Sequence, residues 1–258
     1  MRYIKSFAND AAIQSAVDDK SLGHPYVALD DQLHRIDWNG KDVDYSGMYL
    51  TIEVLESGIF SLKNRLFSYS INGGSWVSPS GAVDFSVNTG DKIRFKAGFN
   101  PDQYVSSPLY GNTIRFNVYG NIMSIIYGDN FDGQTQYRID CALFDTCTGL
   151  VDASGLILPA TSFTNIANYK GMFNGCISLI TAPDLTLGVL VKECYKWMFQ
   201  NCYSLSYIKC LATNISAQDC THFWVQNVSP TGTFVKKAGV TWPTGDSGIP
   251  SGWTVIEE

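Results

Sequence analysis

The segment Met172-Phe173-Asn174-Gly175-Cys176-Ile177-Ser178-Leu179 decides the fold, because its pattern occurs three times in the chain. The pattern Met/Leu-Phe-x-x-Cys-x-x-Leu also begins at Leu143 and at Met198, so the offsets between copies are 29 and 26 residues. The shorter spacing continues once more without the motif, since Cys194 recurs as Cys220. The sequence therefore predicts stacked repeats that end in a capping unit with no successor to pack against.

Equivalent residues of neighbouring repeats are expected to form columns in a shared core, because one such repeat is too short to bury its apolar residues alone. A Cys in such a column acts as a compact hydrophobe rather than as a reactive thiol. The predicted repeat core has three columns: Phe144, Phe173 and Phe199; Leu150, Leu179 and Leu205; Cys147, Cys176 and Cys202.

The first half of the chain has a different pattern. Residues 6–18 are predicted to form a short helix, and residues 25–38 a hairpin that turns at Asp30-Asp31. Apolar residues then alternate with polar ones in five runs between residues 50 and 118, with Gly- and Asn-rich turns between them, which is typical of half-buried antiparallel strands.

The predicted fold class is mainly β with some α (α+β). A β-sandwich-like domain is expected to precede a short leucine-rich-repeat solenoid with a C-terminal cap. The predicted domains are 1–44, the helix and hairpin; 45–120, the sandwich; and 121–258, the solenoid with its caps.

Composition excludes several classes of function. The net charge of −6 disfavours a nucleic-acid partner, which requires clustered Lys and Arg. All seven Cys lie between Cys141 and Cys220 without a C-x-x-C pair, and the three His are scattered, so no metal or other cofactor is expected. No stretch has the apolar length of a membrane span or a signal peptide, and we expect neither.

The repeats resemble those of the BspA-type bacterial leucine-rich-repeat proteins, which occur on cell surfaces and in prophages of gut anaerobes. The resemblance rests on Met-Phe-x-x-Cys-x-x-Leu with Leu158-Pro159 or Ala182-Pro183 in the linking segments, and on the tail that includes Gly248–Trp253. It covers residues 121–258 and implies a cell surface or phage virion as the location; otherwise the chain is expected in the cytoplasm.

The expected function is non-enzymatic recognition of a glycan or protein at a cell or phage surface. No nucleophile, base or metal motif predicts catalysis, so no catalytic residue is assigned. The alternatives are a structural virion or assembly component without a ligand and, third, a polysaccharide hydrolase that uses an unrecognised pair of acids. Ligand identity and oligomeric state stay open.

Two sets of residues are candidates for ligand binding. The first set is the row two residues after each repeat Leu, Asp152, Thr181 and Tyr207. The third residue after each Leu is expected to point inward in a tight turn, which leaves the first and the second residue for the outer surface. The second residue is the candidate because the residues at this position are the more polar or amphipathic. The second set is an aromatic cluster that either presents rigid rings to a ligand or fills the core. It consists of Tyr195, Trp197, Tyr203, Tyr207, Phe223 and Trp224.

Overall fold

A computed structural model of the chain describes residues 5–6, 26–29, 32–35, 47–63, 67–96, 109–134, 142–158 and 169–258. The chain divides into two units, residues 1–44 and residues 45–258.

The first unit contains a three-stranded sheet. Its strand β2 (Tyr26–Leu29) pairs in parallel with β1 (Lys5–Ser6) and antiparallel with β3 (Gln32–Arg35). The β2–β3 pair is a hairpin within the range where the sequence predicts one. The predicted helix over residues 6–18 lies outside the described residues, apart from Ser6 in β1.

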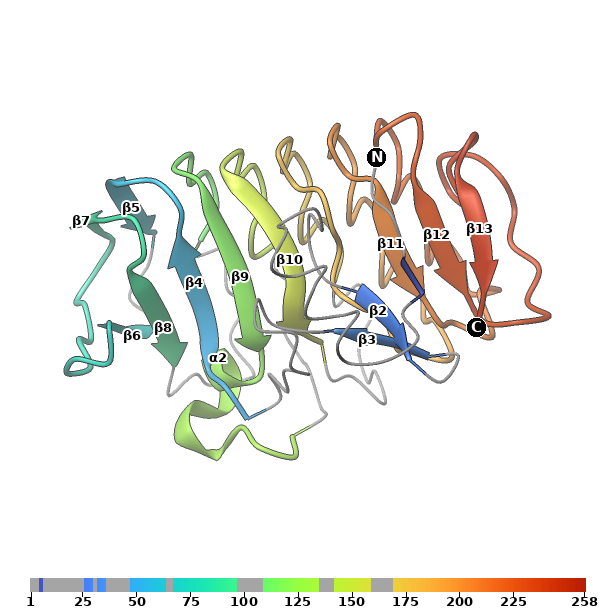
Figure 1. Cartoon of the computed structure of the whole chain (residues 1–258). Helices are drawn as coiled ribbons and strands as arrows, with labels where there is room; N and C mark the ends of the chain where they lie inside the picture. Colours follow the sequence, from blue (N-terminus) through green and yellow to red (C-terminus); the bar gives the residue numbers. More distant parts are fainter. Residues whose placement is uncertain are drawn as a thin grey trace. The chain divides into compact units, whose positions relative to one another are not determined.

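The second unit is built on one long sheet (Figure 1). Its first part has the order β10-β9-β4-β8-β6 and its last part the order β11-β12-β13, and isolated parallel bridges from Asp152 to Thr181 and from Thr181 to Tyr207 connect the two parts. The strands are β4 (Leu50–Val54), β6 (Ser68–Ile71), β8 (Lys92–Lys96), β9 (Phe116–Asn121), β10 (Leu150–Ile157), β11 (Tyr207–Cys210), β12 (Thr233–Lys236) and β13 (Thr254–Glu257).

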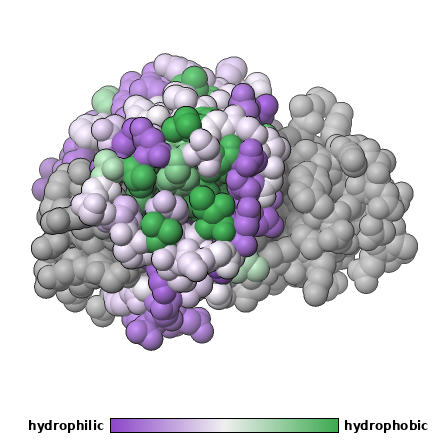
Figure 2. All heavy atoms as spheres, turned by 90° about the vertical axis from the view of Figure 1, so that its left-hand side faces the viewer, coloured by the Kyte–Doolittle hydropathy of each residue, from purple (hydrophilic) through white to green (hydrophobic). Residues whose placement is uncertain are grey.

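The sheet changes from antiparallel to parallel pairing at β9. This strand runs antiparallel to β4 and parallel to β10, and β11, β12 and β13 are parallel to one another. A second, two-stranded sheet of β5 (Gly58–Leu62) and β7 (Val83–Val87) packs on the antiparallel part through Phe60, whose ring lies 6.2 Å from that of Phe95. Figure 2 shows apolar atoms on the face at the β5–β7 end, and the exposed apolar residues in this part of the chain include Ile59 and Val77.

The predicted boundary between residues 120 and 121 is wrong, because β9 and β10 pair across it in one continuous sheet. One buried cluster likewise runs from Leu50 and Phe60 in the first half to Phe199 and Trp224 in the second. Residues 45–120 and 121–258 therefore belong to one unit with a shared core.

The predicted fold class is also contradicted. Of the described residues, 32% lie in strands and only 4% in helices, and these residues do not show a leucine-rich-repeat solenoid. They contain one α-helix, α2 (Ser124–Tyr127), followed by the 3-10 turn η1 (Gly128–Asn130). The physical reason lies in the repeats, whose motif segments form successive tight turns instead of helices.

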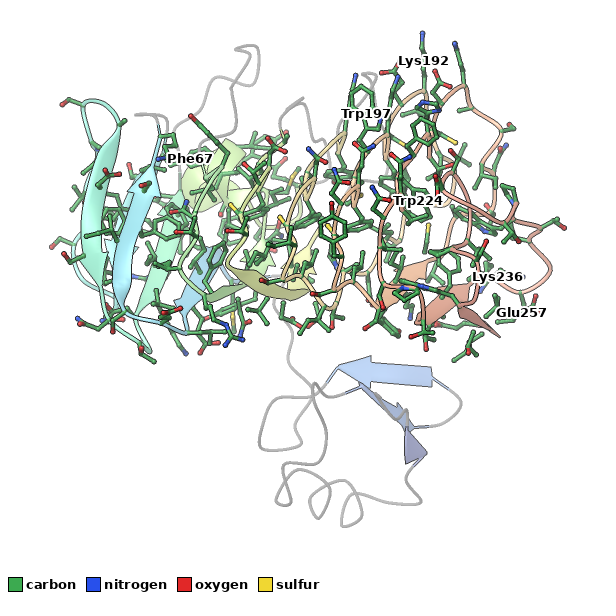
Figure 3. The ribbon with its side chains drawn as sticks, turned by 90° about the horizontal axis from the view of Figure 1, so that it is seen from above. Phe67, Lys192, Trp197, Trp224, Lys236 and Glu257 are labelled. Atoms are coloured by element: carbon green, nitrogen blue, oxygen red, sulfur yellow. The ribbon has the colours of Figure 1, made fainter. Side chains whose placement is uncertain are left out.

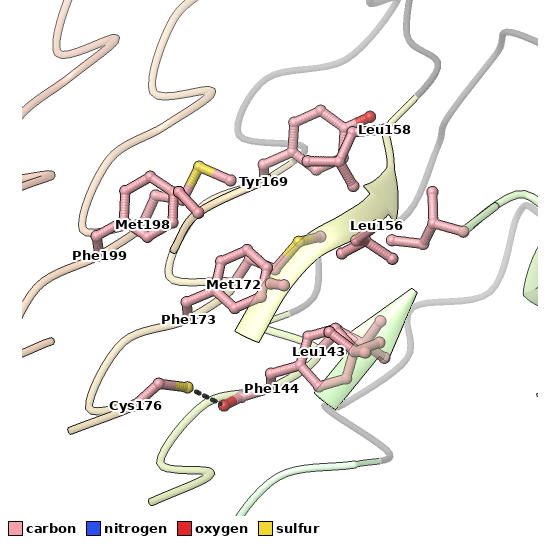
Figure 4. Packing of buried hydrophobic residues seen from close by; sticks show 14 of the residues in the cluster. Leu143, Phe144, Leu156, Leu158, Tyr169, Met172, Phe173, Cys176, Met198 and Phe199 are labelled. Atoms are coloured by element: carbon pink, nitrogen blue, oxygen red, sulfur yellow. Dashed lines mark hydrogen bonds between the residues drawn. The ribbon is translucent and has the colours of Figure 1, made fainter. Parts of the chain in front are cut away.

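The aromatic residues of the repeats form a buried stack. Phe144 and Phe173 have ring centroids 5.5 Å apart with nearly parallel planes, and Phe173 and Phe199 repeat this distance (Figure 4). The column of three Leu and the column of three Cys predicted beside them are also fully buried. Equivalent residues of the repeats thus pack on one another, as their spacing predicts.

Candidate functional site

The predicted row Asp152, Thr181 and Tyr207 is brought together by parallel bridges, but it is buried. The exposed fractions are 4%, 1% and 6%. The residues one position earlier, Val151, Ile180 and Ser206, are half-buried. The expectation that the predicted row forms an accessible outer surface is therefore not met.

The exposed aromatic side chains of the predicted cluster, Trp197, Tyr203 and Phe223, lie instead on the tight turns, on the side of the repeats away from β11–β13. We call the surface formed by segments 169–177, 193–203 and 219–229 the turn face. Figure 3 shows Trp197 and Lys192 projecting on this side, whereas Lys236 and Glu257 lie on the side of the strands.

The turn face is shaped by a regular series of hydrogen bonds, each from a backbone amide to the carbonyl oxygen three residues earlier. The amide of Met198 donates to the carbonyl oxygen of Tyr195 at 3.0 Å, and that of Gln200 donates to Trp197 at 3.2 Å. Every fourth residue has a positive φ: Glu193 at 57°, Trp197 at 58° and Asn201 at 61°. A left-handed residue at this interval ends each turn before a helix forms.

Trp197 and Phe223 occupy equivalent left-handed positions in successive repeats, with φ angles of 58° and 49°. The preceding repeat has Gly171 there, with φ 63°. The repeats are joined directly at this point, because Gly171 N donates to Lys196 O at 2.9 Å and Trp197 N to His222 O at 3.0 Å. The left-handed conformation raises the free energy of the folded state by about 1–2 kcal/mol for a bulky residue, and glycine does not incur this strain.

Each of these two residues is 37% exposed, so burial explains their presence only in part. The Nζ atoms of Lys170 and Lys196 lie 5.0 Å and 4.9 Å from the centroid of the Trp197 ring. The ring of His222 lies 4.2 Å from that of Phe223. The two exposed rings are thus held by neighbouring side chains, and we call them the aromatic pair.

Carboxylates pair with the lysines beside Trp197. Glu193 accepts a hydrogen bond from Lys170 at 2.9 Å and lies 3.5 Å from Lys196, which is also 4.0 Å from Asp219. The hydrogen bond from Lys170 lowers the pKa of Glu193, so this carboxylate stays charged at neutral pH. Two ammonium groups and two carboxylates therefore compensate one another around the ring.

The structure divides the aromatic cluster predicted from the sequence. Tyr195 and Trp224 are fully buried and stack with a ring distance of 6.1 Å, and Tyr207 is buried in β11. Trp197, Tyr203 and Phe223 are exposed. The repeat itself contains the signal that separates them, since Trp197 and Phe223 align with Gly171 and therefore stand where the core requires no side chain.

The described residues contain no group of His, Cys, Asp or Glu that could hold a metal ion. Among them, no helix is long and apolar enough to cross a membrane. The six described cysteines are buried free thiols. Comparison of the chain with protein-family models, with curated proteins and with solved structures finds no match.

Proposed function

We propose that this chain is a non-enzymatic recognition module that binds a glycan or a protein of a cell or phage surface through the aromatic pair, Trp197 and Phe223. One observation carries the proposal: two bulky rings at equivalent positions of successive repeats are exposed in a backbone conformation that disfavours them. Rigid aromatic side chains dominate the binding energy of many recognition surfaces. We also propose a surface location, because the repeats resemble BspA-type sequences.

Substitution of the aromatic pair by glycine tests this function. Gly171 shows that the turn accepts glycine at this position, so the variants Trp197→Gly and Phe223→Gly keep the backbone. The matched control is Val189→Ser, which removes a 58% exposed apolar side chain from another part of the surface. Fluorescently labelled protein is applied to a glycan array and to a panel of intact bacterial cells.

The proposal expects binding that the control retains and that either glycine variant weakens at least about tenfold. It is overturned if the wild-type protein binds neither the array nor the cells, or if a folded Trp197→Gly/Phe223→Gly double variant binds as wild type does.

A further inference from the structure

The rings of the aromatic pair are separate and stand among polar groups. Lys170 and Lys196 flank Trp197, and His222 packs on Phe223. A stable protein interface buries about 800 Å² on each partner around a desolvated apolar centre. Isolated rings in a charged surrounding suit a smaller amphipathic ligand with apolar patches and many hydrogen-bonding groups.

A sugar ring has this character. One of its faces presents C–H bonds, whose positive polarisation the negative face of an aromatic ring attracts. Its hydroxyl groups both donate and accept hydrogen bonds. Around Trp197 the ammonium groups of Lys170 and Lys196 supply donors, and the carboxylates of Glu193 and Asp219 supply acceptors. Both kinds of partner therefore stand beside the ring.

The paired charges around Trp197 favour an uncharged sugar over a charged one. An acidic group on the ligand would have to displace Glu193 from Lys170 and Lys196, and a basic group would have to displace the lysines from Glu193. Either exchange breaks an existing ion pair and leaves one charge unpaired. An uncharged ligand avoids this cost, because hydroxyl groups bind to the paired charges without separating them.

We infer that the ligand is an uncharged hexopyranose oligosaccharide, with one sugar ring against Trp197 and a further part of the chain toward Phe223. The inference rests on the proposed function and specifies the ligand class of the same site. The neighbouring repeats are hydrogen-bonded to one another at Trp197 and His222, so a ligand longer than one sugar unit contacts both rings.

Titration calorimetry with four uncharged hexasaccharides (of α-glucose, β-glucose, mannose and galactose) tests the inference, with galacturonic acid hexamer as the acidic comparator. We expect at least one uncharged hexamer to bind more tightly than the acidic one. Its affinity should change by less than about twofold between about 0.05 M and 0.5 M NaCl, because no net charge is neutralised. Trp197→Gly should weaken it at least about tenfold, and Val189→Ser should not.

Binding of the acidic hexamer alone, with a steep salt dependence, would overturn the inference and leave the proposed function standing. So would binding to intact cells that depends on Trp197 while none of the uncharged hexamers binds, since the ligand would then belong to another class. Binding of an uncharged hexamer that is unchanged in the folded double glycine variant would overturn both.

Discussion

The Sγ atom of Cys176 donates a hydrogen bond to the carbonyl oxygen of Phe144, 3.0 Å away and in the preceding repeat (Figure 4). The same bond joins Cys202 to Phe173 at 3.0 Å. Each motif Cys thus binds the backbone of the neighbouring turn, in addition to filling the space beneath it. This second role explains why the position has Cys instead of Ala or Val.

Replacement of Cys176 by Ala is expected to destabilise the protein by about 1–3 kcal/mol. The variant loses a hydrogen bond, leaves the Phe144 carbonyl without this donor and creates a small cavity. Urea unfolding followed by circular dichroism measures the change. An unchanged midpoint would show that the thiol contributes neither bond nor packing.

The buried thiols also predict a loss of stability at alkaline pH. Burial raises the pKa of Cys147 and of Cys210 to about 12. In the unfolded chain a thiol ionises near pH 8.5, so above that pH the unfolded state binds fewer protons than the native state and is favoured. Stability should fall from about pH 9 toward pH 12, by roughly 1 kcal/mol per thiol and pH unit.

Comparison of urea unfolding at pH 8 and pH 10 for the wild type and Cys147→Ala isolates this effect from other titrating groups. The variant should lose less stability over the interval than the wild type does. Equal losses would mean that Cys147 ionises as readily in the folded protein as in the unfolded chain.

Phe173 is the middle ring of the stack, in contact with Phe144 and Phe199. Phe173→Ala is expected to cost about 3–5 kcal/mol, because it removes a large buried side chain from between two packed neighbours. Phe173→Leu keeps most of the volume and should cost less than about 2 kcal/mol. Thermal unfolding of both variants checks the order, and a milder effect of Ala than of Leu would refute the stack.

Gly149 packs directly against the backbone segment that precedes β9. A Cβ atom there would overlap the carbonyl oxygen of Ile114 and lie 2.5 Å from that of Thr113. Gly149→Ala is therefore expected to destabilise by about 1–3 kcal/mol, through backbone displacement. The matched control is Ser204→Ala at the equivalent, exposed position of a later repeat, which should stay within about 0.5 kcal/mol of wild type. Equal chemical-denaturation midpoints for the two variants would contradict the close approach.

The buried columns could be predicted from the sequence because spacing and residue type agree. The 29- and 26-residue offsets place Phe144, Phe173 and Phe199 in equivalent positions, and only a stacked arrangement buries all three. The alternation in residues 50–54 and 93–95 likewise predicts strands whose apolar residues share a buried face, as those of β4 and β8 do.

The division into domains could not be predicted from local patterns. A change from alternating strands to a long repeat looks like a boundary, but pairing of β9 with β10 depends on a register that neither segment encodes alone. The left-handed conformation of the turn residues could not be predicted for a similar reason. Nothing in the residue types of Trp197 or Phe223 indicates a positive φ, since bulky side chains disfavour it.

The burial of the candidate row could not be predicted, because the inward set at the third residue after each Leu does not show whether the remaining positions are covered. Asp152, Thr181 and Tyr207 share a row as predicted, and yet each is buried. Alignment of Trp197 and Phe223 with Gly171 would have indicated the turn face from the sequence alone.

The most direct test of the central claim is the indole N–H resonance of Trp197 in a nitrogen–proton correlation spectrum, assigned with Trp197→Phe, during titration with the tightest-binding uncharged hexasaccharide. Trp224 serves as the internal control, because its buried Nε1–H donates to the carbonyl oxygen of Gly248 at 2.8 Å. The account predicts that the Trp197 resonance shifts saturably with the added sugar while that of Trp224 stays in place. A Trp197 resonance that does not move at saturation would contradict it.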